Sequence, residues 1–580
     1  MTTSGVDVVD RLHAAGLAKG DPLGLALVRD GRFGIATSSG ALSFGGDTGP
    51  AVVSLIEETL RPRWTWWSSE TAETLVAAGV RVSRCWDIAA AHRLLFGGWK
   101  ADPGLVWAQL HGLAPESLPA PKSRDLFNYT DYDGNLDDPL RSDGHLHPEW
   151  AIGGWAESTE RIVRWAELAF ATAVLQRNKL TDLADHPRAA STVRSESAAE
   201  LLCVELAADG LPMDRLTAEE IIGRIVGPRT RNEVEAAHER ARRDAEVLRH
   251  VPRSARIDLR SPAQVRSLLR SIGLDLPDTR AWRLRELSDT HPVVEALLTW
   301  RKAERVATTY GYGWVDEHLA DDGRLRGSWT GCDGAAGRMT ASAGLHNMPV
   351  EMRGAVVAEE GKVFVRADLR QIEPRVLAVI SGDAALARAC RDDDIYAPVA
   401  AQLGVDRATA KVAVLGAMYG QTTGVGARAL RRLEATYPVA MSYLSDADRS
   451  GHAGRDLRTY GGRLVKMWSA NNAEIDEKEA RRIESARGRY GRNALVQGAA
   501  AELFKVWAVT VRARADACGA EIVLCLHDEL LVQVAEDRSA DGTSLVEDCL
   551  HEAVRNLAPD DSVRFFADVS VVKTWSDAKV

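Results

Sequence analysis

The 580-residue sequence lacks several features that mark specialised classes of protein. It has only 7 cysteines and no CxxC pair, which excludes a disulfide-stabilised secreted scaffold and a cysteine-rich zinc site. No apolar run approaches the roughly 20 residues of a membrane-spanning helix. The N-terminus has no basic stretch followed by an apolar core, so we expect neither a secretory signal nor a membrane partner.

A net excess of positive charge is also missing. The 82 acidic residues outnumber the 72 lysines and arginines, which gives a formal net charge of −10. This argues against a protein that coats nucleic acid over its whole surface, although binding depends on local patches. Apolar content of 45% and charged content of 27% are those of an ordinary soluble protein, and the length allows several domains. We expect a cytoplasmic protein.

The chain divides into segments of different pattern. Residues 1–110 alternate short apolar runs with helical stretches, an α/β pattern. Residues 114–150 are rich in Pro, Asp and Gly and predict a long surface loop. The period is helical from 155 to about 307, and this part includes an arginine-rich helix around 229–256. A solvated helix face is the simpler interpretation of that helix. Residues 385–485 are mostly helical as well.

Two aspartates lie where predicted strands end. Asp368 closes the apolar strand "KVFVRAD", and Asp528 lies at a tight turn between the two strands of "EIVLCLHDELLVQVAED". If these strands are neighbours in one sheet, the carboxylates could share two divalent cations that assist an in-line phosphoryl transfer. Oxygen ligands favour Mg²⁺. Taken singly, Asp368 is explained as a helix cap and Asp528 as a turn residue.

A basic and aromatic stripe follows in "RATAKVAVLGAMYG". Its members are spaced by four, so they form a helical stripe about 120° wide; they are Arg407, Lys411, Leu415 and Tyr419. The two cations suit a triphosphate, with a base stacked beyond them. Lys411 could also donate a proton to departing pyrophosphate. The simpler alternative is an amphipathic helix with a basic edge.

Two further segments carry polar side chains that suit nucleic acid. In "RYGRNALVQGAAAELFK" three long polar residues share one helical face, from which minor-groove acceptors can be read: Arg489, Asn493 and Gln497. The small residues 498–501 that follow suit a closely approaching backbone. The loop "GRMTASAGLHNMP" carries three more polar residues: Arg338, His346 and Asn347.

In this order, the segments resemble the motifs of family-A DNA polymerases of the DNA polymerase I type. "DLRQIEPR" (368–375) and "LHDE" (526–529) are similar to the two palm motifs, and 407–420 is similar to the fingers helix. The loop with Arg338 and the helix with Gln497 resemble two further motifs. The resemblance covers about 190–580. It implies a bacterial protein with α/β and α+β domains: a right hand with an antiparallel palm sheet and helical fingers and thumb, and an N-terminal RNase H-like, exonuclease-type α/β domain.

The resemblance also implies domain boundaries and an activity. The expected parts are an exonuclease-like domain at 1–180, a thumb at 181–325, a palm at 326–385 and 486–580, and fingers at 386–485. The expected activity is template-directed addition of dNTPs to a primer 3′-hydroxyl, with two Mg²⁺ ions, or Mn²⁺ as the alternative. The implied partners are primer–template DNA and dNTPs, for a monomer associated with the nucleoid.

Each site residue takes its implied role from the matching motif position. The metal site would comprise Asp368, Asp528 and the Leu369 carbonyl, with Glu529 as an auxiliary carboxylate. Arg407 and Lys411 would bind the triphosphate. The nucleotide pocket would be lined by Tyr419, Gln371, Leu415 and Glu373, of which Glu373 excludes a 2′-hydroxyl. The DNA contacts would be Arg338, Asn347, Arg489, Asn493, Gln497 and His527. The arginine-rich helix would be the part of the thumb on the duplex.

Several positions depart from the family pattern. Two positions lack an expected aromatic, Leu369 and Leu415, and three others differ in kind: Arg370, Pro374 and Tyr396. They leave open a catalytically weak, polymerase-shaped protein that binds primer–template. A second alternative is a single-subunit phage-type RNA polymerase, against which Glu373 argues.

The N-terminal third is short of the acids that a two-metal exonuclease needs. Asp30 is not part of an Asp-x-Glu pair, although Asp87 is similar to the second element of such a site. The third element appears only as "WAEST", with Thr159 in the aspartate position. We therefore expect a vestigial 3′–5′ exonuclease without proofreading. From its start, we also expect the chain to lack a 5′-nuclease domain.

Overall fold

The computed structural model describes residues 5–38, 43–115, 118, 137–251, 257–420, 426–468, 476–559 and 561–578. The chain forms two compact units. The first comprises Met1–Asp209, Ser328–Thr340 and Val365–Ser570. The second comprises Gly210–Gly327, Ala341–Phe364 and Val571–Val580.

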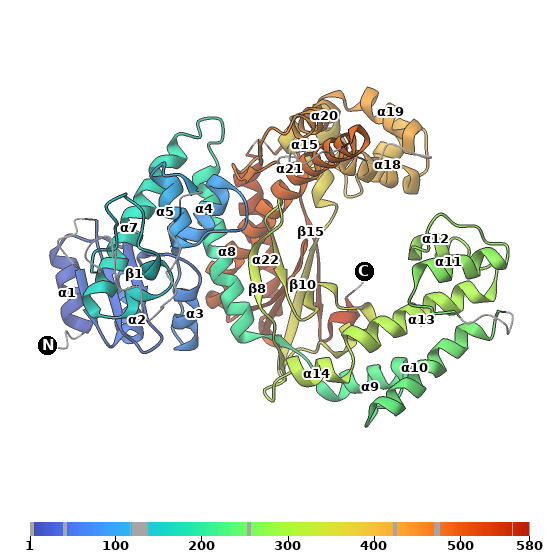
Figure 1. Ribbon diagram of the computed structural model, residues 1–580, viewed down its shortest axis with the longest axis horizontal. Helices are drawn as coiled ribbons and strands as arrows, with labels where there is room; N and C mark the ends of the chain where they lie inside the picture. The colour runs from blue at the N-terminus through green and yellow to red at the C-terminus, as the bar shows by residue number, and fades with distance from the viewer. Residues whose placement is uncertain are drawn as a thin grey trace. The chain divides into compact units, whose positions relative to one another are not determined.

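A mixed sheet forms the N-terminal part of the first unit (Figure 1). Its strands are β1 (Pro22–Leu27), β2 (Phe33–Ala36), β3 (Ser43–Gly46), β4 (Arg63–Trp66) and β5 (Cys85–Asp87). The order is β3-β2-β1-β4-β5, with antiparallel pairing of the first three and parallel pairing of β1, β4 and β5. The α/β pattern predicted for this region is confirmed.

Helices make up most of the rest of this N-terminal part. They are α1 (Gly5–Ala14), α2 (Gly49–Leu60), α3 (Glu70–Ala77), α4 (Ile88–Phe96), α5 (Pro103–Leu110), α6 (Pro148–Ala151), α7 (Thr159–Thr181) and α8 (Ala189–Asp209). Helix α7 packs across β1 and β2. It lies so close that a Cβ on Gly24 would come within 2.5 Å of the Ala166 carbonyl oxygen, which explains a glycine inside a buried strand.

A second, four-stranded sheet carries the residues predicted for the palm. It has the order β13-β14-β10-β15 and is formed by β13 (Glu521–Cys525), β14 (Glu529–Ala535), β10 (Lys362–Leu369) and β15 (Ala567–Val572). Strands β13 and β14 form an antiparallel hairpin, which confirms the predicted turn at His527–Asp528. A two-stranded sheet comprises β8 (Trp329–Asp333) and β9 (Arg338–Ala341).

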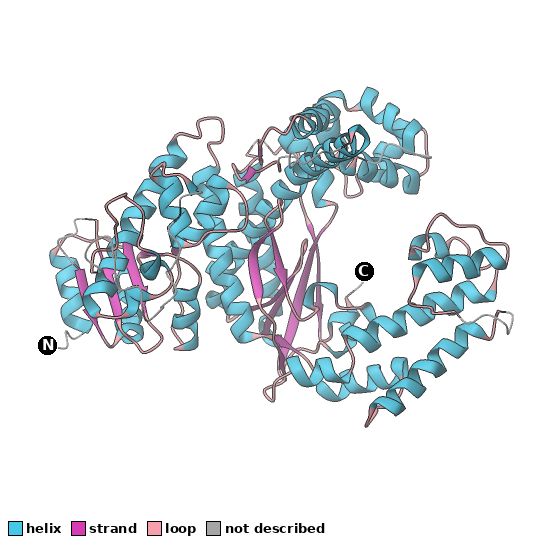
Figure 2. Ribbon diagram, in the orientation of Figure 1, coloured by secondary structure: helices cyan, strands magenta, loops and turns pink. Residues whose placement is uncertain are grey.

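The rest of the first unit is almost entirely helical, as Figure 2 shows by colour. Its helices are α15 (Ile372–Ser381), α16 (Ala384–Ala389), α17 (Tyr396–Leu403), α18 (Arg407–Tyr419), α19 (Gly426–Thr436), α20 (Pro438–His452), α21 (Glu477–Arg514) and α22 (Ser539–Leu557). A small hairpin is formed by β11 (Leu457–Arg458) and β12 (Leu464–Val465).

Helix α21 is the central helix of the first unit, and it packs against α8, α20, α15 and α22. The sequence predicted a helical face that starts at Arg489, and the helix begins earlier, at Glu477, with Asp476 as its N-cap. Together with the following turn to Cys518 it is long and apolar enough to cross a membrane. However, 78% of the apolar window is buried inside the protein, as in the core helix of a soluble protein.

The small residues of α21 lie against protein. Gly498 and the alanines at 499–501 are buried. A Cβ on Gly498 would come within 2.6 Å of the Thr459 side chain, which precedes the β12 strand. The expectation that this segment admits a nucleic-acid backbone is therefore wrong, because the small side chains serve close packing between α21 and the β11–β12 hairpin.

The second unit is mainly helical. Its helices are α9 (Arg215–Val226), α10 (Glu233–Leu248), α11 (Pro262–Ser271), α12 (Ala281–Arg285), α13 (Pro292–Thr309) and α14 (Tyr312–His318), and its short strands are β6 (Leu211–Pro212) and β7 (Arg324–Leu325). The arginine-rich segment forms α10, as predicted, while 252–256 lie outside the described residues. Two of its arginines already have acidic partners within this unit: Arg242 with Glu239 and Arg243 with Glu304.

A buried ion cluster joins distant segments of the first unit. Lys505 on α21 donates to both carboxylate oxygens of Glu196 on α8, at 2.7 and 2.6 Å, and to the Gly331 carbonyl at 2.9 Å. Arg463 also pairs with Glu196. All three side chains are almost inaccessible to solvent. Burial raises the pKa of Glu196, but the two neighbouring cations outweigh it and hold that pKa below its usual value.

We expect Glu196→Gln to lower the free energy of unfolding by about 3–5 kcal/mol, because it leaves two buried cations without their carboxylate. The midpoint of urea unfolding measures the loss. The double variant with Lys505→Met removes one of these cations as well and should recover part of it. Equal stability of Glu196→Gln and wild type would contradict the role of this cluster.

Candidate functional site

The two predicted metal-binding aspartates lie on neighbouring strands. Asp368 is near the end of β10, and Asp528 is in the turn that precedes β14. The Leu369 amide donates to the Asp528 carbonyl at 2.6 Å, which fixes the end of β10 beside the hairpin turn. The sheet therefore brings together two residues that are far apart in the sequence.

Both carboxyl groups resist ionisation. Burial raises the pKa of Asp368, and the nearby Glu529 and Asp568 add to the effect, whereas Arg366 and Arg370 oppose it. Asp528 lies at an exposed turn. Even so, desolvation of its carboxylate by the surrounding protein raises its pKa to about 6, and the negative charges of Asp368, Glu529 and Glu373 contribute to this shift. This concentration of negative charge favours a cation at the turn.

The donor set fits Mg²⁺, an ion that uses one or two carboxylates and takes its other ligands from water and substrate phosphates. No group of three or more His, Cys, Asp or Glu side chains is arranged to hold a metal within the part of the chain that the structure describes. The protein thus offers Asp368 and Asp528 as the main ligands. Leu369 has a buried side chain, and only its backbone could contribute.

A buried arginine that the sequence reasoning did not single out lies between the acids. The Nη2 of Arg366 donates to Asp368 at 2.7 Å, and its Nε donates to Glu529 at 2.8 Å. Glu529, predicted as an auxiliary carboxylate of the metal site, is buried and forms its ion pair with Arg366 within the sheet. The missed signal was the strand period, which places residues 366 and 368 on one face.

Glu373 on α15 is held by two residues from other elements. Arg338 of β9 donates to it at 3.2 Å, and the Tyr419 hydroxyl of α18 donates to it at 2.6 Å. Burial and this contact with Glu373 raise the pKa of Tyr419, while a hydrogen bond to Gln497 of α21 opposes the rise. Four predicted site residues thus form one network.

The predicted stripe on α18 lies on the less buried side of the helix. Its members Arg407 and Lys411 are exposed, and Leu415 and Tyr419 are partly buried. Gly420 ends the helix in the left-handed conformation with φ 71°, which glycine adopts readily. Lys411 has no ion pair among the described residues.

Asp394, which the sequence reasoning missed, connects α18 to the start of α15. The Arg407 Nε donates to it at 2.6 Å, and the Gln371 side-chain amide donates to its other oxygen at 2.8 Å. Gln371 adopts a positive φ of 52° before α15, and its side-chain oxygen accepts from the Ile395 amide at 2.9 Å. These bonds offset the strained backbone.

The residues predicted to contact DNA divide between the units. Arg489 is exposed on α21, and its stem packs against Gly420. The buried Oδ1 of Asn493 has no hydrogen-bond partner among the described residues. His527 is exposed beside Asp528. Asn347 lies in the second unit, where its carbonyl accepts from Arg305.

The positions that depart from the family pattern are mostly packed into the protein. Pro374 is buried in the first turn of α15. Tyr396 is buried at the start of α17, and burial raises its pKa to about 12. Arg370 is exposed and pairs with Asp568 of β15.

The acids considered for an exonuclease have ordinary structural partners. Asp87 is the N-cap of α4 and accepts from the Ala90 amide at 2.8 Å and from the Trp66 indole at 3.1 Å. Burial, and then the charge of Glu200, raise its pKa to about 7. Asp30 is exposed and pairs with Arg32 at 2.9 Å.

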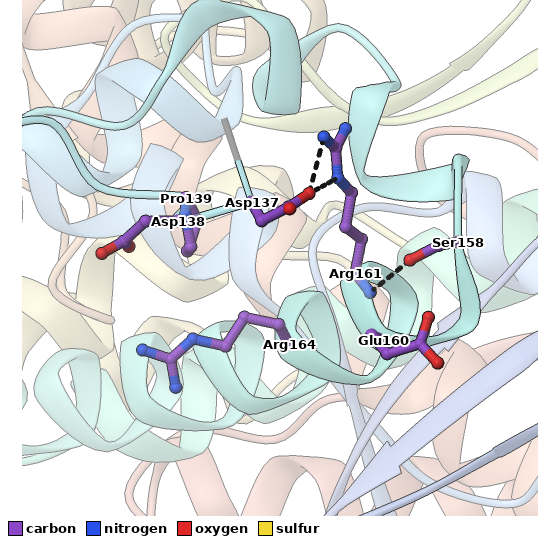
Figure 3. A pocket seen from close by; sticks show the side chains of 7 residues that line it. All are labelled: Asp137, Asp138, Pro139, Ser158, Glu160, Arg161 and Arg164. Carbon is purple, nitrogen blue, oxygen red and sulfur yellow. Dashed lines mark hydrogen bonds and ion pairs between the residues drawn. The ribbon is translucent and has the colours of Figure 1, made fainter. Parts of the chain in front are cut away.

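The third exonuclease position borders a cavity of about 520 Å³, shown in Figure 3. Its lining includes the neighbours of Thr159, namely Ser158 and Glu160. The Arg161 Nε and Nη2 donate to Asp137 at 3.1 and 3.0 Å, as the dashed lines in Figure 3 show.

The predicted loop at 114–150 lies partly outside the described residues, with 116–117 and 119–136 among those left out.

Comparison with known proteins identifies a family and individual relatives of this chain. The family model described as DNA polymerase family A matches residues 229–577. The thermostable DNA polymerase I of Thermus filiformis is 31% identical over 324 residues, or 51% of this chain and 38% of that protein. The Thermus aquaticus enzyme is 29% identical over 380 residues, 60% of this chain and 45% of that protein. The chain therefore spans less than half the length of these relatives.

A solved structure of similar fold covers the chain from end to end. It is the POL domain of Pol1 from M. smegmatis in complex with DNA primer-template and dNTP, with a TM-score of 0.69 over 100% of this chain and 99% of that chain. The sequences are 19% identical, so this likeness shows the fold alone. It confirms the predicted fold class.

Proposed function

The chain belongs to DNA polymerase family A, and from this premise we propose that it is a template-directed DNA polymerase that adds dNTPs to a primer 3′-hydroxyl. The observation that carries the proposal is the placement of Asp368 and Asp528 on neighbouring elements of the sheet, beside the Glu373–Tyr419–Arg338 network. A family-A fold without such an acidic pair would have no means of binding the ions that the reaction needs.

Each residue of the first unit has a defined task in this proposal. Asp368, Asp528 and the Leu369 carbonyl would hold two Mg²⁺ ions, which would supply the positive charge that activates the primer hydroxyl and stabilises pyrophosphate. Arg407 binds the triphosphate with its planar fork, and Lys411 binds it as a point charge and gives a proton to the leaving group. His527, Arg489, Asn493 and Gln497 position the primer–template, and the second unit contributes Asn347 and α10.

The nucleotide pocket has an unusual lining but an intact anchor for sugar discrimination. Leu415 stands where the family has an aromatic residue against the sugar, and Gln371 lines the same pocket. We therefore expect weaker packing against the sugar. Glu373 remains fixed by Arg338 and Tyr419, which presents its side chain to the sugar. We infer discrimination against ribonucleotides, which separates this function from that of an RNA polymerase.

The Arg407–Asp394 ion pair leads to a test of the triphosphate site. A triphosphate that binds Arg407 must replace Asp394, so Asp394→Asn should lower the KM for dNTP. Because the pair is exposed, the effect is screened and we expect about two- to fivefold. Steady-state primer extension at varied dNTP concentration measures it. Asp393→Asn, which touches Arg564 instead, is the matched control; a KM that rises in Asp394→Asn would contradict this arrangement.

We also propose that the N-terminal region has no exonuclease activity and serves as a structural platform. The support is the engagement of Asp87 as a buried helix cap and of Asp30 in a surface pair. Degradation of a mismatched primer end that depends on Asp87 would overturn this. The predicted division into an exonuclease-like domain, a thumb, a palm and fingers remains part of the proposal, as do the monomeric state and the cytoplasmic, nucleoid-associated location.

Primer extension on a defined template tests the whole proposal. The wild-type protein with Mg²⁺ should yield full-length product whose sequence follows the template, and chelation of the metal should stop synthesis. The favoured second function, a polymerase-shaped primer–template binder, rests on Leu369, Pro374 and Leu415. It predicts binding to the same DNA without any extension in either Mg²⁺ or Mn²⁺.

A further inference from the structure

Charged side chains of alternating sign run across three strands at the candidate metal site. Glu529 begins β14, Arg366 and Asp368 lie on the same face of β10, and Asp568 lies on β15, where Arg370 pairs with it. Since β10 lies between β14 and β15, all of these groups meet at one end of the sheet. Only Arg366 contacts two of the acids among the contacts that the structure describes here.

The position of Arg366 makes it a direct competitor of a metal ion. Its guanidinium lies 2.7 Å from Oδ2 of Asp368, one of the two oxygens through which Asp368 would ligate a cation. The side chain of Arg366 is only 6% exposed, so water screens its charge weakly. A positive charge at this distance repels a divalent cation and occupies one lone pair of the ligand.

The same arginine also satisfies a buried acid. Glu529 is buried and accepts from the Arg366 Nε at 2.8 Å. A buried carboxylate is costly without a cationic partner. Arg366 therefore has a structural task toward Glu529 that is separable from its effect on Asp368, and an experiment must separate the two.

We propose that Arg366 is a positioning residue that holds Asp368 and Glu529 in place and lowers the affinity of the site for divalent metal. The inference rests on the proposed function only in taking Asp368 and Asp528 as the metal ligands. In the absence of substrate the guanidinium neutralises one ligand, so the site binds metal weakly. The negative charge of an incoming triphosphate would compensate for the guanidinium, so metal and nucleotide favour each other's binding.

The test measures metal binding without catalysis. Mn²⁺ binding to the full chain, without DNA or nucleotide, is followed by the paramagnetic resonance of the free ion. Removal of Arg366 alone would take away the ion pair that the buried Glu529 makes with it, so Glu529→Gln is the reference background. Adding Arg366→Met to that background removes the guanidinium while every buried group stays neutral. Thermal unfolding confirms that each variant is folded.

We expect the double variant to bind Mn²⁺ at least about tenfold more tightly than Glu529→Gln. An opposite charge within about 4–6 Å changes the proton affinity of an aspartate by about 10- to 1,000-fold, and a divalent cation carries twice the charge. Arg366→Lys in the wild-type background keeps the charge and should stay within about threefold of the wild-type affinity. Lys362→Met, the same loss of charge on the same strand, is the control and should change nothing.

The outcomes distinguish this inference from the proposed function. Affinity that is unchanged or weaker in the double variant would overturn the role of Arg366, whereas a purely structural role could not tighten binding. Asp528→Asn should remove the Mn²⁺ site. If Mn²⁺ binds equally well with and without Asp528, the metal site itself is misplaced and the proposed mechanism fails together with the inference.

Discussion

Asp528→Asn is expected to lower the rate of primer extension at saturating Mg²⁺ by at least about 1,000-fold, or about 4 kcal/mol of transition-state stabilisation. The amide keeps the shape of the side chain but removes the negative charge that a hard cation requires. Asp528 is irreplaceable because few acids are available: Glu529 is buried in its pair with Arg366, and Glu373 is bound by Arg338 and Tyr419.

The measurement is single-turnover extension of a labelled primer, with DNA binding followed separately by fluorescence anisotropy. Asp548→Asn, the same substitution at an exposed position on α22, is the matched control and should leave the rate unchanged. We expect DNA affinity to change little in Asp528→Asn. A variant that retains a tenth of the wild-type rate would show that Asp528 is not an essential ligand, and a wild type without extension would favour the binding-only function.

The second large effect is expected in the choice of sugar. Glu373→Ala should raise the incorporation of ribonucleotides relative to deoxyribonucleotides by about 100-fold, because it removes a group that clashes with a 2′-hydroxyl. Arg338 and Tyr419 hold the carboxylate from two sides, so it cannot swing away to admit the hydroxyl. Discrimination that depends on a fixed group is lost when the group is removed.

Competing incorporation of dNTP and NTP on one template gives the ratio directly. Tyr419→Phe keeps the aromatic ring and loses only the hydrogen bond to Glu373, so it should relax the choice by a smaller factor. Glu360→Ala, an exposed glutamate outside the site, should leave the ratio unchanged. If Glu373→Ala discriminates as well as the wild type, then sugar selection has another source, and the RNA polymerase alternative would gain support from high NTP use by the wild type.

The residues that sequence reasoning placed correctly are those whose geometry is set within one element. The hairpin at Asp528 follows from two apolar runs around a turn, and the stripe on α18 follows from a spacing of four. The predicted helix began too late, because residues 477–488 are densely charged and have little apolar periodicity. The structure continues the helix there because α20 packs alongside α21.

Contacts between distant segments could not be predicted from one sequence. Arg366 and Glu529 are 163 positions apart, and Lys505 and Glu196 are 309 positions apart. Such pairs depend on strand order and on how helices pack, neither of which is encoded in local spacing. For this reason the sequence indicated the acids of the candidate metal site but not the arginine between them, and it indicated Arg407 but not Asp394.

Helix α21 is a long, stiff element that is fixed at one point. Its 38 residues span about 57 Å. Its N-terminal part carries Arg489, Asn493 and Gln497. About two turns beyond Gln497, Lys505 is fixed by its ion pair with Glu196 of α8. A stiff rod transmits a tilt instead of absorbing it. The contact with α8 therefore sets the direction in which these residues face the primer–template in the proposed function, and cutting the chain after α8 would remove that contact.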